Sequence, residues 1–224
     1  MNPTIIHEDT DFLVIDKPHG MPSAPLSSTD TENVFSIIAK DYPEILNIKG
    51  KKSIEGGLVH RIDTDTRGLL LIARTQNAYD NFMQQQLECK FIKHYTAHCF
   101  SASSVFALKL PYIITSRFRP FGEGRKMVQP VFDTSGTAAQ KKASPKFYST
   151  EIYSIQQKNS VMVIDCKITE GYRHQVRSHL SSLGLKIIND ALYGSIIDNN
   201  SMQFYAKKLE FYHPRTNNYC NYEL

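Results

Sequence analysis

The chain has 224 residues, of which 41% are hydrophobic and 21% charged. This composition is typical of a soluble globular protein and excludes a largely disordered one. The formal net charge of +4 is compatible with a polyanionic partner but does not require one. The longest apolar run, residues 69–73, is too short to span a bilayer, and the N-terminus lacks the pattern of a signal peptide. We expect a cytoplasmic protein with no membrane partner.

The first half of the chain alternates short strands with loops. Residues 4–7 and 12–15 are β-prone runs divided by a polar turn, and two prolines and a glycine then indicate a loop. A short helix is predicted over residues 33–40. A buried strand at 69–73 and a polar helix at 76–88 follow.

The second half is richer in strands. A strand is predicted at 91–100, and the Pro-, Gly- and Lys/Arg-rich residues 116–146 suggest a long loop excursion. Residues 147–155 and 161–168 resemble a hairpin, and an amphipathic helix is expected over 173–183 with a glycine to end it. The remaining expectations are strands at 204–206 and 209–212 and a polar tail.

Strands outnumber helices in this pattern and mostly follow one another directly. That order favours a mixed, mainly antiparallel central sheet with flanking helices, an α/β (α+β) arrangement, over a βαβ series. We expect a single domain, 1–224, that is a monomer. The cysteines have neither CxxC spacing nor a nearby histidine pair, so neither a metal site nor a disulfide framework is indicated.

The segment 57–73 places a carboxylate, Asp63, on a tight turn directly before the buried strand. A turn residue is held in place while its side chain stays accessible, which suits a catalytic group. The same residue could equally cap the turn by bonding its own backbone. The residue pattern alone leaves both readings open.

The segment His60-Arg61-Ile62-Asp63, followed by Thr66-Arg67-Gly68 and three leucines, resembles the catalytic motif of the RluA-type RNA pseudouridine synthases. Three further motifs resemble this family in the same order: residues 6–20, ending in Lys-Pro-His-Gly, the strand 93–97, and residues 170–194. Together they cover nearly the whole chain. The resemblance implies the pseudouridine synthase fold, an RNA substrate (ribosomal or transfer RNA), and neither metal nor redox cofactor.

The resemblance also assigns roles to residues. Asp63 matches the essential aspartate, which could act as a nucleophile or as the base that removes the ribose 2′ proton. Tyr95 matches the active-site tyrosine, and Arg177 the arginine that pairs with the aspartate. Arg61 matches the arginine associated with base flipping, which costs roughly a few kcal/mol.

Other residues near these motifs are expected to bind substrate or RNA. Lys93 could support the pocket, touch phosphate or be solvated, and His60 could shape the turn. The clusters of Lys and Arg in residues 49–52, 117–126 and 141–146 would contact phosphates without reading sequence. The remaining candidates for substrate or RNA contacts are Arg67, Arg173, His174 and Gln175.

The chain departs from the family pattern at several positions. Arg67 stands where many relatives have serine, Tyr172-Arg173 where they have Arg-Thr, and Asn189 where a glycine is common. Arg67 and Arg173 could therefore add contacts that relatives lack. We expect no N-terminal accessory RNA-binding domain. Two alternative functions stay open: an RNA-binding protein that kept the fold and lost catalysis, and a nucleoside hydrolase that admits water.

Overall fold

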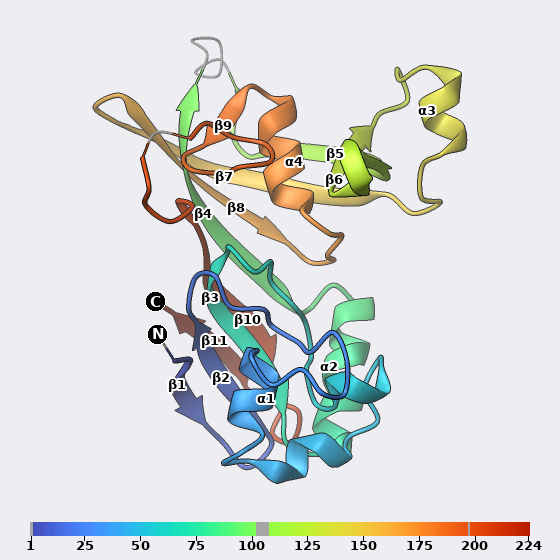
Figure 1. Ribbon diagram of the computed structural model, residues 1–224, viewed down its shortest axis with the longest axis vertical. Coiled ribbons are helices and arrows are strands. Elements are labelled where there is room, and N and C mark those ends of the chain that lie inside the picture. Colours follow the sequence, from blue (N-terminus) through green and yellow to red (C-terminus); the bar gives the residue numbers. More distant parts are fainter. Residues whose placement is uncertain (1, 102–107, 197) are drawn as a thin grey trace. The chain divides into compact units, whose positions relative to one another are not determined.

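The structure is a computed structural model that describes residues 2–101, 108–196 and 198–224. The chain divides into two compact units (Figure 1). Unit 1 comprises residues 1–93 and 205–224, and unit 2 comprises residues 94–204. No helix among the described residues has the length and apolar character needed to cross a bilayer.

Unit 1 is built on β1 (Thr4–Glu8), β2 (Phe12–Lys17), β3 (Arg67–Ala73), β10 (Phe204–Tyr212) and β11 (Tyr219–Glu223). These strands are neighbours in that order; β3 and β10 run parallel, and the other neighbouring pairs run antiparallel. The parallel pair approaches closely at Gly68, where an added Cβ would lie 2.2 Å from the carbonyl oxygen of Ala206. A glycine is therefore required at the start of β3.

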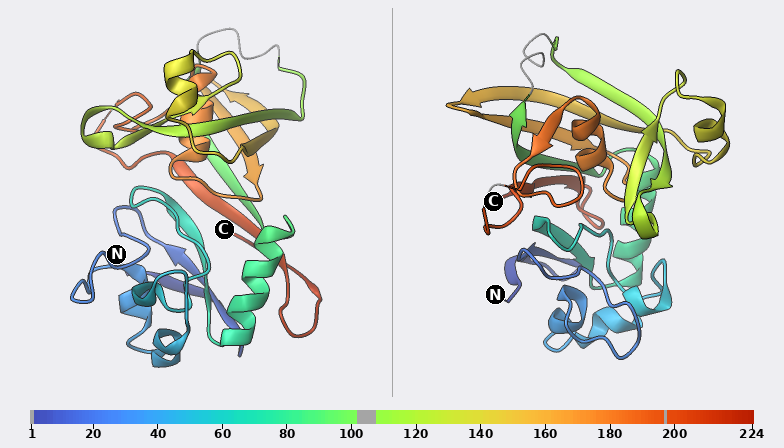
Figure 2. Two further views of the ribbon diagram at one scale, coloured as in Figure 1. Left: turned by 90° about the vertical axis from the view of Figure 1, so that its right-hand side faces the viewer. Right: turned by 45° about the horizontal axis from the view of Figure 1, so that its top comes forward.

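Two α-helices and two 3₁₀ turns complete unit 1. They are α1 (Val34–Ile38), α2 (Gln76–Leu87), η1 (Pro43–Asn47) and η2 (Ser53–Glu55). Thr75 caps α2 by accepting from the amide of Ala78 at 3.2 Å. Phe82 on α2 packs edge-on against Phe12 and Phe211, so this helix covers the core face of the strands (Figure 2).

Unit 2 is built on β4 (Ile92–Ser101), β5 (Tyr112–Phe121), β6 (Met127–Val131), β7 (Tyr148–Lys158), β8 (Val161–Ile168) and β9 (Leu185–Ile187). The strand order is β4-β8-β7-β5-β6, and β9 pairs with β4. The helices are α3 (Thr137–Lys141), α4 (Gln175–Ser182) and the 3₁₀ turn η4 (Glu123–Arg125). The longer helix, α4, packs against β6, β7 and β9.

The predicted mixed, mainly antiparallel sheet with flanking helices is confirmed, as is the hairpin of β7 and β8. The predicted loop over residues 116–146 is wrong, because the segment contains β6, α3 and most of β5. The prediction of a polar tail after residue 212 is also wrong, because this segment contains β11, which pairs with β10. Arg117, Arg119 and Pro120 concealed β5, which is held by backbone hydrogen bonds to β6 and β7.

Candidate functional site

The turn that carries Asp63 is fixed through its neighbours' backbone. The hydroxyl of Ser23 donates to the carbonyl oxygen of Ile62 at 2.7 Å and accepts from the Ile62 amide at 3.2 Å. On the other side, the carbonyl oxygen of Thr64 accepts from the amide of Gly20 at 3.0 Å. Asp63 itself is half-buried. Its position is thus set from both flanking residues.

Lys17 is a third support of this turn, and its side chain is fully buried. Its ammonium donates to the carbonyl oxygens of Pro18 at 2.9 Å, Met21 at 2.7 Å and Thr64 at 2.8 Å. An ammonium has three N–H donors, so all three are used. The sequence placed Lys17 at the start of a loop; the signal available was a lysine two positions after a run of four apolar residues.

The charge of Lys17 is maintained against desolvation. Burial lowers the pKa of Lys17 to about 8, and the negative charges of Asp63, Asp65 and Asp16 oppose that shift. At neutral pH the group is therefore still protonated, and the fold places a positive charge in the electrostatic field of the candidate catalytic carboxylate.

The residues beside Asp63 have different surroundings. Arg61 has a side chain that is 57% exposed and pairs with Glu55 at 3.2 Å. The Nε2 atom of His60 accepts from the amide of Leu71 at 3.2 Å, and burial lowers the pKa of His60 to about 3. His60 is therefore neutral, and it ties the turn to β3, in keeping with the expectation that it shapes the turn.

Two basic candidates of unit 1 are already engaged. Arg67 is exposed and forms an ion pair with Asp16 at 2.8 Å. Lys93 is buried, with its ammonium 5.5 Å from the centre of the Phe91 ring. Lys93 is therefore not a solvated lysine in this structure, and the expectations that it supports the pocket or contacts phosphate stay predictions.

In unit 2, Arg177 and Asp190 form a buried bidentate ion pair. The Arg177 Nε lies 2.8 Å from Oδ2 of Asp190, and a terminal nitrogen lies 2.8 Å from Oδ1. Burial alone raises the pKa of the Asp190 carboxyl, but Arg177 and the amides of Leu192 and Tyr193 outweigh burial and hold that pKa below its usual range. The guanidinium is thereby fixed, while the predicted role of Arg177 as partner of Asp63 stays a prediction.

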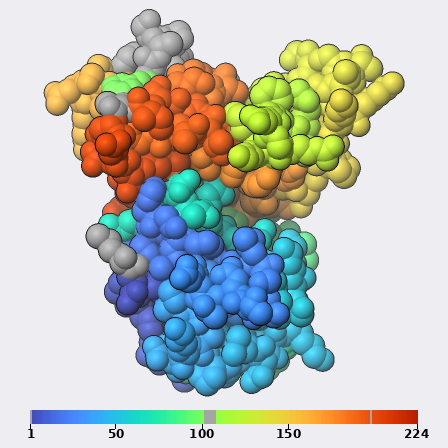
Figure 3. Space-filling model, in the orientation of Figure 1, coloured from blue at the N-terminus to red at the C-terminus, as the bar shows by residue number. Residues whose placement is uncertain are grey.

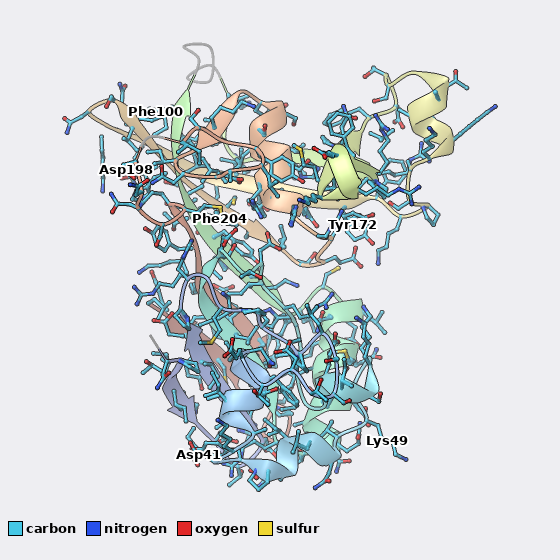
Figure 4. All side chains as sticks on the ribbon, viewed as in Figure 1. Asp41, Lys49, Phe100, Tyr172, Asp198 and Phe204 are labelled. Carbon is cyan, nitrogen blue, oxygen red and sulfur yellow. The ribbon has the colours of Figure 1, made fainter. Side chains whose placement is uncertain are left out.

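The loop before Asp190 explains one departure from the family pattern. Asn189 has a φ of 60°, the left-handed region where glycine is favoured and asparagine is tolerated. Its side-chain amide donates to Asp198 at 2.6 Å, a residue labelled in Figure 4. Asparagine therefore meets the backbone requirement that a glycine would meet, and adds a hydrogen bond.

Three candidate residues precede or begin α4. Gln175 is buried and donates to the carbonyl oxygen of Ser149 at 2.9 Å, while His174 contacts the hydroxyl of Tyr193 at 3.1 Å. Arg173 donates to the carbonyl oxygens of Arg125 at 2.8 Å and Met127 at 3.1 Å. These contacts hold α4 and the β5–β6 hairpin in place, so the structure shows supporting contacts for all three.

Tyr95 lies on β4 and is buried. Its ring stacks on that of Phe204, labelled in Figure 4, with 5.2 Å between centroids and 10° between planes. One face of the Tyr95 ring is therefore occupied by protein, and a base could stack only on the opposite face.

Among the described residues, Asp9, Asp11 and His213 form one group with the spacing of a metal site. Nδ1 of His213 accepts from the amide of Arg215 at 3.1 Å, so the ring proton is assigned to Nε2, which lies 3.5 Å from Asp9. Arg215 pairs with Asp11 at 2.8 Å. Because these groups already bind one another, we assign the group to the packing of β10 and β11 against the β1–β2 turn.

Comparison with known proteins decides the family. The family model described as RNA pseudouridylate synthase matches residues 11–182. The chain belongs to the RNA pseudouridylate synthase family. The chain is 28% identical over 225 residues to the uncharacterised RNA pseudouridine synthase YlyB of Bacillus subtilis, covering 100% of this chain and 69% of the relative.

A further relative and a solved structure are also similar to this chain, and the solved structure shows the fold. The ribosomal large subunit pseudouridine synthase D of Zymomonas mobilis is 28% identical over 230 residues, covering 94% of this chain and 65% of the relative. The structure titled Human RNA Pseudouridylate Synthase Domain Containing 1 has a TM-score of 0.71 at 19% identity, covering 100% of this chain and 83% of that one. The chain spans between about half and about two thirds of the length of the curated relatives it matches.

Proposed function

We propose that the protein isomerises uridines in RNA to pseudouridine, with Asp63 as the catalytic carboxylate. The observation that carries the proposal is the fixed turn, in which Ser23, Gly20 and Lys17 hold the backbone on both sides of Asp63. A catalytic group needs this fixed position, because a misplacement of about 1 Å can cost roughly 100-fold in rate.

The reaction breaks the bond between ribose C1′ and uracil N1 and forms a bond between C1′ and C5. The proton on C5 is released and N1 takes up a proton, so nothing is oxidised and no water is consumed. Asp63 acts either as nucleophile or as the base for the ribose 2′ proton. Tyr95 would stack on the uracil with the ring face that Phe204 does not cover, and relay the C5 proton.

Arg61 is proposed to fill the gap left by the extruded base. Its long side chain is exposed, and its present partner is the buried carboxylate of Glu55. Moving into RNA would break this pair, but Lys52 also lies near Glu55, at 3.4 Å. The Glu55 carboxylate would therefore keep one cation while Arg61 is displaced.

Ribosomal RNA of the large subunit is the proposed substrate, because several relatives are named as large subunit pseudouridine synthases. The test is release of tritium from transcripts labelled at uracil C5. Asp63→Asn should reduce release by at least about 100-fold, the lower range for a positioned acid–base group. Asp65→Asn is the matched control, since it removes the same charge from an exposed residue of the same turn.

The two variants have opposite expected outcomes. Asp65→Asn should retain most of the activity, and both proteins should unfold at similar urea concentrations. Equal loss in the two variants would show that the charge of the turn matters and not the position of Asp63. No release by the wild-type protein on ribosomal or transfer RNA would favour the non-catalytic RNA-binding alternative, and free uracil would favour the hydrolase.

A further inference from the structure

The net positive charge of the chain is concentrated in residues 117–146. This segment holds seven Lys and Arg and two Asp and Glu, a net charge of +5, whereas the whole chain carries +4. The remainder therefore has a net charge of −1. The segment forms the second half of β5, all of β6, and α3, whose atoms are yellow-green to yellow in Figure 3.

One face of β5 contributes to the core of unit 2. Ser116 and Phe118 on this face are fully buried. Phe118 stacks on Tyr172, with 5.0 Å between centroids, and contacts His179 of α4 at 4.9 Å. Because side chains alternate along a strand, the residues between and beyond them lie on the opposite face.

That opposite face presents two arginine–phenylalanine pairs. The guanidinium of Arg117 lies 5.4 Å from the centre of the Phe147 ring, and that of Arg119 lies 5.3 Å from the centre of the Phe121 ring. The rings of Phe121 and Phe147 are 42% and 48% exposed. We call Arg117, Arg119, Phe121 and Phe147 the Arg/Phe surface.

The two guanidiniums lack the partners that arginines in folded proteins usually have. Arg117 donates to the amide oxygen of Gln140, and Arg119 to that of Gln129 at 2.6 Å. Over the described residues, neither arginine pairs with a carboxylate, and the Nε atom of each is buried without a hydrogen-bond partner. In the part of the chain that the structure describes, neither positive charge is thus paired with a negative one.

We propose that the Arg/Phe surface binds single-stranded RNA outside the nucleotide that is modified. Exposed rings can stack on bases of any sequence, and arginine adds phosphate contacts and cation–π attraction. Residues two apart on a strand are spaced about 7 Å, close to the spacing of successive phosphates in an extended strand. This inference rests on the proposed function only in that the substrate is RNA.

The test uses a fluorescein-labelled 15-nucleotide oligoadenylate and fluorescence anisotropy. Oligoadenylate contains no uridine, so its binding is independent of pseudouridine formation. Arg117→Gln/Arg119→Gln should weaken binding at least about tenfold and reduce the dependence of log K on log salt by about 1.4, for two phosphate contacts to a single strand. Lys40→Gln/Lys158→Gln, which removes two exposed lysines elsewhere, should change affinity less than about twofold.

A second variant separates stacking from charge and does not touch buried groups. Phe121→Ala/Phe147→Ala should weaken oligoadenylate binding about fivefold or more, equivalent to about 1 kcal/mol. It should leave the weaker binding of an abasic 15-mer unchanged. Equal losses for the arginine and lysine pairs, or equal affinity of wild type for the two oligonucleotides, would overturn the proposal.

A different class of partner gives a distinct result. If the surface binds an acidic protein segment, a 15-residue polyglutamate should displace oligoadenylate as well as unlabelled RNA does, which would also overturn the proposal. Tritium release by the wild type is measured separately. If the wild-type protein binds oligoadenylate but releases no tritium, the proposed function is refuted and the proposal for the Arg/Phe surface is not.

Discussion

Two buried cations, Lys17 in unit 1 and Arg177 in unit 2, are held in different ways. Lys17 binds three neutral carbonyl oxygens, whereas Arg177 binds the charged carboxylate of Asp190 through two parallel hydrogen bonds. An ammonium can turn its three donors toward separate loops, whereas a planar guanidinium matches one carboxylate. The first arrangement therefore joins chain segments, and the second fixes the orientation of one side chain.

Lys17→Met should give the largest effect, because three carbonyl oxygens lose their common donor. Each unsatisfied group costs about 1–3 kcal/mol, so we expect a loss of about 5 kcal/mol in the free energy of unfolding. Urea unfolding at pH 7 measures this loss. Lys17→Gln keeps two N–H donors without the charge and should lose less; equal losses would show that charge, not donor number, matters.

The pH dependence of Lys17 is a second measurement on the same residue. Its pKa in the folded protein, about 8, lies below the ordinary lysine pKa of 10.5. Between these values the unfolded chain binds a proton that the folded protein has released, so this group makes stability rise with pH in that window. Lys17→Gln should lack this rise, and an unchanged profile would refute the assignment.

Asp190→Asn should have the next largest effect, about 3–4 kcal/mol, because it leaves the Arg177 charge buried without its anion. The amide oxygen can still accept from the backbone of Leu192 and Tyr193, so the loop itself should persist. Ala191→Ser, at an exposed neighbouring position, is the control and should change stability by less than about 0.5 kcal/mol. A loss below about 1 kcal/mol for Asp190→Asn would show that the charged pair contributes little.

Substitution of His179 should give the smallest effect, a change in how steeply the free energy of unfolding depends on pH. Burial lowers the pKa of His179 to about 3, from the ordinary histidine pKa of 6.5. Stability from this group is complete above pH 6.5 and falls as the pH drops toward 3, by about 1.4 kcal/mol per unit. His179→Gln should remove that slope in urea unfolding between pH 6 and 4.

His60 provides the comparison in unit 1, since burial also lowers its pKa to about 3. His60→Gln should remove a similar slope. If neither His60→Gln nor His179→Gln reduces the dependence of the free energy of unfolding on pH between 6 and 4, the two histidines are not kept neutral by the fold.

The sequence by itself determined the elements with regular hydrophobic spacing. The strands β2, β3 and β8 and the helix α4 were predicted because their buried positions alternate every two residues, form continuous apolar runs, or repeat every three to four residues. The motif around Asp63 was also visible, because its residue types and order are local properties of the chain.

Tertiary structure alone decided the strands β5, β6 and β11 and the role of Lys17. The strand β5 contains two arginines and a proline, β6 contains a proline, and β11 contains an asparagine and a glutamate. All three form because neighbouring strands supply their hydrogen bonds. Lys17 reads as a loop residue until the fold brings the carbonyl of Thr64, 47 positions away, within 2.8 Å. Local patterns specify which faces are apolar, whereas buried polar contacts depend on segments that meet only after folding.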